Sequence, residues 1–323
     1  MRGFPRLRPD GKFPVGGGDS QMSANPNLKR LRRTMMFLPA QKPSLIKDAY
    51  IYGADSLMFD LEDAVAENQK DAARFSLYHA LTTIDYRGCE KIVRINGLDT
   101  PHWKEDIRVS VAAGCDGIRI PKCEHASDVR TVVEHIERAE REFSRPEGST
   151  LVMAALESPL GILNAYEICI ACPERMIGVA ISGGDFRKCM QTSYQPGGIE
   201  MLAGRGQMLL AARAAGVQCF DTVFTNLNDP EGFRAEVVQN KQMGFDGKSI
   251  ISPKQIAVVH EVFTPTEKEI IAAEKIVRAY REMVSSGVGV FTVDGKMIDI
   301  AFVPGAERTI ALAKASGVYE GDL

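Results

Sequence analysis

Short apolar segments alternate with longer helical segments from residue 33 onward, and this alternation constrains the fold more than any other feature of the sequence. The apolar segments, rich in β-branched residues, are 33–40, 56–62, 91–96, 117–122, 151–158, 176–185, 217–224 and 247–253. Stretches with helical periodicity lie between them, and one of these ends at Gly216, a residue type that favours helix termination. Eight strands, each followed by a helix, within about 220 residues predict an α/β fold of the TIM (β/α)8 barrel type, with an open doubly wound sheet as the alternative.

The two ends of the chain differ from this central region. Residues 1–28 lack periodicity and are rich in Gly and Pro, so we expect a disordered N-terminal tail before a barrel domain over 29–265. Residues 266–323 exceed what a barrel needs, and they predict a long helix with a capping box at Thr266, a hairpin over 289–302 and a final helix. We expect this C-terminal helix-hairpin-helix extension to act as a lid or as an oligomerisation arm.

Charge and composition exclude several classes of function. The 39 Lys and Arg residues nearly balance 42 Asp and Glu residues, so the net charge of −3 provides no broad positive field for nucleic acid. The basic run KRLRR at 29–33 is interpreted as a solvated segment, with contact to the phosphates of a thioester carrier as the alternative. No apolar stretch approaches the roughly 20 residues that cross a bilayer, and no secretory signal is recognised, so we expect no membrane association. Seven cysteines, an odd number, favour a reducing cytoplasm.

Charged side chains stand at the ends of most predicted strands. They are Asp60, Glu62 and Asp63 at the second strand, Arg94 and Asn96 at the third, Lys122 at the fourth, Glu157 at the fifth, Asp185 at the sixth, Asp221 in the seventh and Lys248 in the eighth. The carboxyl ends of barrel strands share the face on which barrel enzymes carry out their chemistry. We therefore expect acids and bases from at least five strands to converge there.

Glu157 and Asp185 are the pair best placed to bind a divalent cation. Two carboxylate oxygens leave the rest of a Mg²⁺ octahedron to water and substrate. Glu62 or Asp63 could then hold the coordinated waters. The alternative is that acids such as Asp60, Glu62 and Asp63 cap the helix that follows them.

Arg94 ends an otherwise apolar strand. Burying its guanidinium is costly unless an anion meets it. A substrate carboxylate held by two parallel hydrogen bonds meets that need. An internal ion pair with Asp60 or Glu62 is the alternative.

Seven segments of the sequence stand together in a recognisable order. They are RRTMMFLPA, YGADSLMFDLEDAV, KIVRINGLDT, GIRIPK, AALESPLGI, GFDGKSIISPKQI and VDGKMID. In this order and spacing, over about residues 29–316, they resemble the citrate lyase beta subunit family, within the HpcH/HpaI aldolases and citrate lyases. The resemblance implies a Mg²⁺-dependent lyase on a TIM barrel that splits a citryl thioester of an acyl carrier protein into oxaloacetate and acetyl-carrier. Its expected partners are the carrier (gamma) and transferase (alpha) subunits of a citrate lyase complex.

The resemblance also implies roles for residues at matching positions. Glu157 and Asp185 are expected to bind the metal, and Glu157 and Arg94 to bind the substrate. Asp299 in the extension is expected to act as a catalytic acid or base, often from a neighbouring subunit, and this favours a homo-oligomer.

Four more positions take their expected roles from the same resemblance. Glu62 and Asp63 are expected to assist catalysis. Arg33 and Lys42 are expected to line the site of the carrier's pantetheine arm.

Four positions depart from the family pattern. Gly184 stands immediately before Asp185 where an acidic residue is usual, and Gly198 stands where Glu is usual. Asn226 stands in a loop where Asp is expected, and Ala301 replaces the Pro that often follows GKMID by one residue. Two alternatives therefore stay open beside the citryl-carrier lyase. One is a lyase that acts on a free coenzyme A thioester such as citramalyl-CoA or malyl-CoA, and the other is an inactive scaffold subunit.

Overall fold

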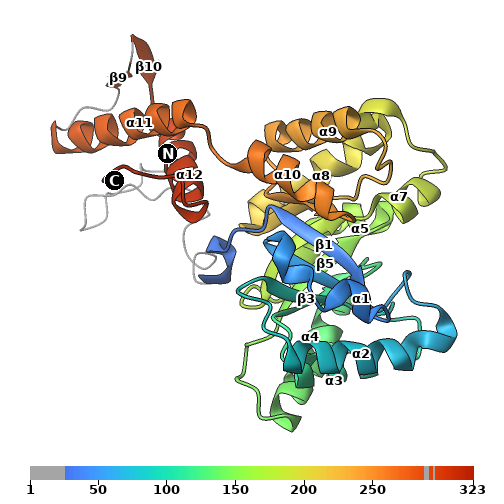
Figure 1. The fold of residues 1–323 in the computed structure, drawn as a ribbon. Coiled ribbons are helices and arrows are strands. Elements are labelled where there is room, and N and C mark those ends of the chain that lie inside the picture. The colour runs from blue at the N-terminus through green and yellow to red at the C-terminus, as the bar shows by residue number, and fades with distance from the viewer. Residues whose placement is uncertain (1–25, 287–290, 294) are drawn as a thin grey trace, which may run out of the picture.

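Eight parallel strands form a closed barrel in the computed structural model, which describes residues 26–286, 291–293 and 295–323 (Figure 1). The strands are β1 (Thr34–Pro39), β2 (Ser56–Asp60), β3 (Glu90–Arg94), β4 (Gly117–Ile120), β5 (Leu151–Leu156), β6 (Met176–Ile181), β7 (Gln218–Asp221) and β8 (Gly247–Ile250). β1 pairs with both β2 and β8, and this double pairing closes the sheet. The TIM barrel prediction is confirmed, since each strand overlaps one of the eight apolar segments, and the open-sheet alternative is wrong.

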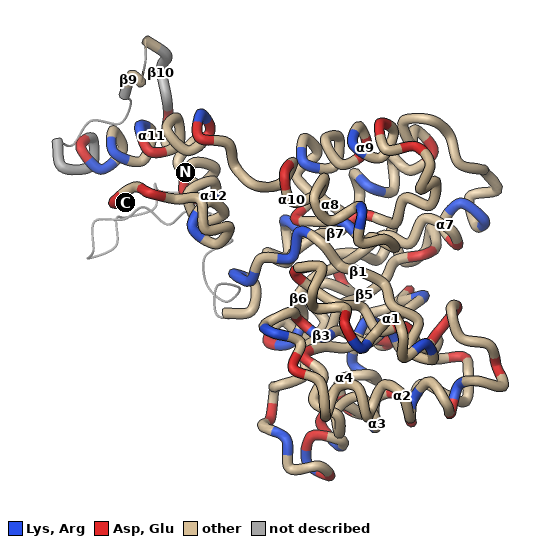
Figure 2. Tube along the Cα trace, in the orientation of Figure 1, with Lys and Arg blue, Asp and Glu red and all other residues tan. Residues whose placement is uncertain are grey.

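Helices cover the outside of the barrel. They are α1 (Pro43–Ile46), α2 (Lys70–Thr83), α3 (Trp103–Ala113), α4 (Ala126–Glu142), α5 (Pro159–Leu163), α6 (Ala165–Cys169), α7 (Gly183–Cys189), α8 (Leu202–Ala215), α9 (Pro230–Met243) and α10 (Ile256–Phe263). Gly216 ends α8 in the left-handed conformation with φ +70°, as the sequence predicts. Figure 2 shows Lys and Arg interspersed with Asp and Glu along these helices, without a uniformly basic face.

An apolar cluster fills the interior of the barrel. It consists of Met35, Met58, Ile92, Leu151, Met153, Ile177, Ala180 and Phe220. Successive side chains of a strand point to opposite faces, so the inward position after Met58 or Ile92 lies two residues further on. At that position β2 and β3 carry Asp60 and Arg94. These two charges therefore face the interior at the carboxyl end of the barrel.

Asp221 and Lys248 do not lie at the mouth of the barrel, although the sequence predicts that they do. Phe220 points into the barrel, so the next residue, Asp221, points outward and meets the surrounding helices. Its carboxylate accepts hydrogen bonds from Arg205 of α8 at 2.8 and 2.9 Å and from Lys248 at 2.8 Å. Glu236 of α9 completes this buried network. Although burial would raise the pKa of Asp221, the charges of Lys248 and Arg205 lower it to about 2.

The basic run at 29–33 also differs from its interpretation as a solvated segment. Arg32 is 1% exposed, and its Nε and Nη2 donate to Glu90 at 2.7 and 2.6 Å. Arg33 binds Asp55. These pairs join the chain before β1 to the amino ends of β2 and β3. The preceding 3₁₀ helix, Pro26–Lys29, includes the last residues of the predicted tail, and residues 1–25 lie outside the described part of the chain.

The C-terminal extension stands beside the barrel as a separate lobe (Figure 1). It consists of α11 (Glu267–Ser286), the antiparallel strands β9 (Phe291–Val293) and β10 (Lys296–Ile298), and α12 (Val303–Ala315). The capping box is present, since Thr266 N donates to Glu269 Oε2 at 2.7 Å and Glu269 N to Thr266 Oγ1 at 3.3 Å. Ala273 and Val277 of α11 pack against α12. The helix-hairpin-helix prediction is therefore confirmed for the described residues, while 289, 290 and 294 of the predicted hairpin lie outside them.

We predict that Asp221→Asn lowers the free energy of unfolding at pH 7 by about 3–5 kcal/mol, because it leaves Lys248 and Arg205 with an uncompensated buried charge. Urea denaturation measures this loss. Glu261→Gln, which breaks the exposed pair with Arg234, is the control and costs less than about 1 kcal/mol. Equal effects of the two variants would contradict the prediction.

The same network predicts a pH dependence of stability. The folded-state pKa of Asp221 lies below its ordinary value of 3.8, so the contribution of Asp221 to stability is complete above that pH. The contribution is lost as the pH falls from about 3.8 toward the folded-state pKa. The difference in unfolding free energy between wild type and Asp221→Asn therefore narrows in that acid range.

Candidate active site

Three charged side chains lie side by side at the mouth of the barrel. Asp60 of β2 is the register partner of Arg94 of β3, and Arg94 is the register partner of Arg119 of β4. Register partners on parallel strands point to the same face of the sheet. All three side chains line a pocket of about 780 Å³, which we call the main pocket; Phe37, Asp63 and Ser249 also line it.

Arg94 forms an internal ion pair, which was the alternative to binding a substrate carboxylate in the sequence analysis. Its Nε and Nη2 each donate to the Asp60 carboxylate at 2.8 Å. Its Nη1 lies 2.8 Å from Glu62 Oε2, which is ion-pair distance without hydrogen-bond alignment. Burial would raise the pKa of Asp60, but Arg94 and the backbone N–H groups of Glu62 and Ala64 lower it. Arg94 is thus held rigidly at the pocket wall, with each nitrogen of its guanidinium group facing an acidic side chain.

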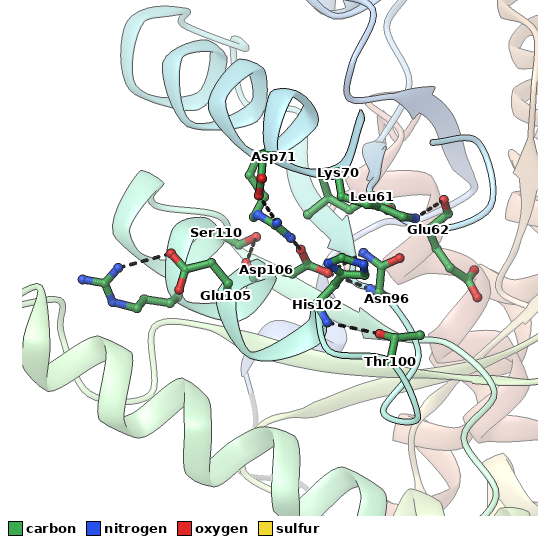
Figure 3. A network of polar contacts seen from close by, with 12 residues as sticks. Leu61, Glu62, Lys70, Asp71, Asn96, Thr100, His102, Glu105, Asp106 and Ser110 are labelled. Carbon is green, nitrogen blue, oxygen red and sulfur yellow. Dashed lines mark hydrogen bonds and ion pairs between the residues drawn. The ribbon is translucent and has the colours of Figure 1, made fainter. Parts of the chain in front are cut away.

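The loop after β2 is ordered by Asp60 and by Lys70 of α2. Asp60 accepts hydrogen bonds from Glu62 N at 2.9 Å and from Ala64 N at 3.2 Å. Lys70 Nζ donates to the carbonyls of Leu61 and Glu62, as Figure 3 shows. α2 begins only at Lys70, and no side chain caps its N-terminus. The interpretation of the acids as caps of this helix is therefore wrong; Asp60 instead stabilises the loop and Arg94.

Glu62 contacts both Arg94, which lines the main pocket, and Lys122, which lines a second hollow. Glu62 is 4% exposed, and its Oε1 accepts a hydrogen bond from Lys122 Nζ at 2.8 Å. Burial raises the pKa of Glu62, although Arg94 and Lys122 act against the shift. Lys122 itself adopts a left-handed backbone with φ +49°, which is uncommon for a residue other than Gly and clusters at functional sites.

Glu157 is a buried carboxylate that forms no ion pair among the described residues, although the more distant charges of Arg94 and Arg119 act to lower its pKa. It is 3% exposed, and its Oε1 has no hydrogen-bond partner. Burial, together with the charge of Glu62, raises the pKa of Glu157 to about 7. A buried carboxylate with a free oxygen is unfavourable unless a cation or a proton meets it.

Asp185 lies with Glu157 at the second hollow, of about 440 Å³, which we call the acidic hollow; Glu124 and Asp128 also line it. Asp185 belongs to the first turn of α7, and its side chain is half-buried. The structure thus brings together the two residues expected to bind a metal. Within the described residues, no group of three or more His, Cys, Asp or Glu side chains is arranged to hold a metal. Two carboxylates fit Mg²⁺, which keeps several water or substrate ligands.

The two glycines that depart from the family pattern leave this arrangement intact. A Cβ added at Gly184 would meet nothing within 4 Å, so the missing acid leaves the backbone before Asp185 unaltered. Gly198 has φ +64°, and an added Cβ would lie 2.6 Å from Arg205 Nη1. Gly at 198 therefore follows from the local backbone, and neither position supports a decayed site.

The remaining expected residues lie in different places. Lys42 is exposed at the start of α1, two residues before Ser44, which lines the main pocket. Asn96 is buried and donates to Asp106 at 2.7 Å, so it supports the loop after β3 (Figure 3). Asp299 is exposed in the extension and accepts a hydrogen bond from Ala301 N.

Arg33 differs from its expected place beside the pantetheine arm. It precedes β1 and binds Asp55 and Thr264. A six-residue strand rises by about 3.3 Å per residue, so Arg33 lies the height of the barrel away from the mouth. We exclude it from the site.

Arg119 is a buried cation in the main pocket that the sequence analysis missed. The segment GIRIPK places it between two Ile residues near the end of β4, much as Arg94 lies between Val93 and Ile95 at the end of β3. This shared pattern, an arginine near the end of an apolar strand, could have identified Arg119 from the sequence. Arg119 is 1% exposed.

Comparisons with known proteins identify relatives of this chain. The HpcH/HpaI aldolase/citrate lyase family matches residues 33–253. Citrate lyase subunit beta of Leuconostoc mesenteroides subsp. cremoris is 51% identical, over 92% of this chain and 98% of its own. A (3S)-malyl-CoA thioesterase of Cereibacter sphaeroides is 36% identical, over 89% and 96%. The crystal structure of protein CitE from Mycobacterium tuberculosis with magnesium, acetoacetate and coenzyme A superposes with TM-score 0.71 at 28% identity, over 90% and 99%.

We predict that Glu157→Gln weakens Mg²⁺ binding on the order of 100-fold, because it removes one of two anionic ligands while it keeps the side-chain size. Isothermal titration calorimetry measures the affinity. Glu124→Gln is the matched control, since Glu124 lines the same hollow but already accepts a hydrogen bond from Ser158. An unchanged affinity in Glu157→Gln, or an equal loss in both variants, would place the cation elsewhere.

Proposed function

The chain belongs to the HpcH/HpaI aldolase/citrate lyase family, and on that premise we propose that it is a Mg²⁺-dependent carbon–carbon lyase, the beta subunit of a citrate lyase. Its substrate is a citryl thioester of an acyl carrier protein, which it splits into oxaloacetate and an acetyl thioester. The observation that carries the proposal is the buried, unpaired Glu157 beside Asp185. The higher identity to the citrate lyase subunit than to the malyl-CoA thioesterase favours citryl over malyl thioesters.

Glu157 and Asp185 are the residues that would hold Mg²⁺ in this proposal. When bound, the ion supplies Lewis-acid polarisation of the substrate's hydroxyl and adjacent carboxylate oxygens. Arg94, which lines the main pocket, would orient that carboxylate, and its pair with Asp60 keeps the guanidinium in one position. Glu62 and Asp63 act as positioning residues: Glu62 holds Lys122, and Asp63 lies 3.5 Å from Arg94.

Cleavage requires two proton transfers. The hydroxyl loses its proton as the carbonyl of oxaloacetate forms, and the electrons of the broken carbon–carbon bond pass to the enolate of the acetyl thioester. That enolate carbon must then gain a proton. Asp299 is the residue that we propose for this second transfer.

Asp299 reaches the chemistry from a neighbouring subunit in this proposal. It is not among the residues that line the main pocket, and the extension lies on the side of the barrel where β1 begins (Figure 1). An exposed acid on a separate lobe is suited to a site on a second copy of the chain. The proposal therefore includes a homo-oligomer.

The outer part of the main pocket suits the carrier's pantetheine arm. Leu45, Ile51 and Tyr52 line it with 46%, 60% and 47% of their surface exposed. Exposed apolar side chains at a pocket entrance provide a surface for an apolar ligand segment. Lys42 lies at the same rim. We propose that the carrier and transferase subunits of citrate lyase approach this end of the barrel.

The proposed location is the cytoplasm. All seven cysteines are free of disulfide bonds, which supports a reducing compartment. In the described part of the chain, none of the helices has the length and apolar character to cross a membrane.

The lyase proposal predicts oxaloacetate release from a citryl-carrier thioester. The purified chain should release oxaloacetate with Mg²⁺ and lose this activity with a chelator, as a coupled malate dehydrogenase assay would show. A citramalyl-CoA substrate, assayed in parallel, tests the alternative lyase. Absence of cleavage of either thioester, with bound Mg²⁺ and an intact fold, would support the scaffold alternative instead.

Mixed oligomers test the placement of Asp299. We predict that Asp299→Ala and Arg94→Ala each lower kcat/KM by about 100-fold or more. A co-refolded equal mixture should recover about a quarter of wild-type activity if the chain is a dimer, since half the dimers then contain one intact composite site. No recovery would show that Asp299 and Arg94 of the same chain act together.

A further inference from the structure

Arg119 is a fully buried cation that forms no ion pair with a carboxylate in the part of the chain that the structure describes. Three arginines are among the largest fully buried side chains: Arg32, Arg119 and Arg205. Arg32 binds Glu90, and Arg205 binds Asp221, in each case through two hydrogen bonds. Within the described residues, by contrast, no carboxylate oxygen lies within 4.0 Å of the Arg119 guanidinium.

The contacts of Arg119 leave most of its donors unused. Its Nη1 donates to Ser249 Oγ at 3.4 Å, a long hydrogen bond, and its Nε has no partner. Its guanidinium lies 5.3 Å from the centre of the Phe37 ring. Its register partner is Arg94, a like charge. Burial and the charge of Arg94 lower the pKa of Arg119 to about 10, although the charges of Glu157, Glu62 and Asp60, which lie beyond ion-pair distance, act against the shift.

This arrangement is unfavourable for the protein alone. An unpaired buried charge costs several kcal/mol of stability, whereas an apolar residue of similar size would cost nothing of this kind. The guanidinium lines the main pocket, so a ligand can reach it. An anionic ligand group in the main pocket would supply the missing partner.

The proposed substrate has one carboxylate more than the groups already described can bind. A citryl thioester carries two free carboxylates. One is attached to the carbon that bears the hydroxyl, and Arg94 and the metal account for it. The other lies on a methylene arm of that carbon. In citramalyl and malyl thioesters this arm is replaced by a methyl group and by hydrogen.

We propose that Arg119 binds the carboxylate on this methylene arm and thereby makes the site selective for citryl thioesters. The inference rests on the proposed lyase function and assigns to that site its substrate-selecting residue. In the product, the same carboxylate is the one furthest from the keto group of oxaloacetate. Pyruvate, which citramalyl thioesters release, lacks it.

The experiment compares two substrates in Arg119→Met, which has similar length and no charge. kcat/KM for citryl thioester should fall about 100-fold or more, since a buried carboxylate loses its partner. kcat/KM for citramalyl thioester should stay level or rise, because the substituted methyl group needs no cation. Equal losses for both substrates, or no loss for citryl thioester, would overturn the inference.

Arg94→Met is the matched control. It removes the arginine that meets the carboxylate common to both substrates, so it should lower kcat/KM for both to a similar extent. Thermal unfolding provides a readout of folding. Because Arg119→Met removes an unpaired buried charge, its Tm should equal or exceed that of wild type.

Product binding separates this inference from the lyase proposal. In the presence of Mg²⁺, calorimetry should show that wild type binds oxaloacetate more tightly than pyruvate and that Arg119→Met abolishes the preference. If the chain is not a lyase but Arg119 still binds this carboxylate, the same preference for oxaloacetate should appear without cleavage of the thioester. Cleavage by wild type, with a preference for oxaloacetate that survives in Arg119→Met, would overturn the role of Arg119 while the lyase stands.

Discussion

The parallel register of β2, β3 and β4, closed into a barrel, is the constraint on which the site depends. Because side chains alternate along each strand, the positions that follow the apolar layer of the interior point into the mouth. Asp60, Arg94 and Arg119 occupy those positions on adjacent strands. No loop is needed to bring them together. The loops add Glu62 and Lys122, and the first turn of α7 adds Asp185, around a row of charges that the sheet has already placed.

Charges buried in the barrel wall and charges at the mouth have different partners. Arg32 with Glu90 and Arg205 with Asp221 form complete pairs, so their desolvation is largely offset and they fix how strands and helices meet. At the mouth, Glu157 has an oxygen without a partner, and Arg119 has no carboxylate within ion-pair distance among the described residues. The two groups carry opposite charges and each shifts the pKa of the other, but both lack an ion pair within the described residues. In the function that we propose, a metal ion would meet Glu157 and a substrate carboxylate would meet Arg119.

Much of the fold and part of the site could be predicted from local patterns. The eight strands follow from apolar runs, the capping box at Thr266 from residue spacing, and the convergence of Glu157 with Asp185 from the rule that strand ends share a face. Arg33 was misplaced because a resemblance over a whole segment does not say which end of a strand faces the ligand. The basic run was taken as solvated because the partner of Arg32, Glu90, lies 58 residues away.

The sequence by itself determined the barrel and its extension, because strand alternation and helix periodicity are local properties. It also pointed to Glu157 and Asp185 at strand ends as the carboxylates that we propose as metal ligands. Only the tertiary structure decided which charged side chains form ion pairs with each other. Asp221 and Lys248 appeared to belong to the mouth, yet they turn outward to Arg205 and Glu236. Arg94 and Arg119 share one local pattern, but only Arg94 has an acid in register on the strand beside it. Pairing across strands depends on register between distant segments, and no local pattern encodes it.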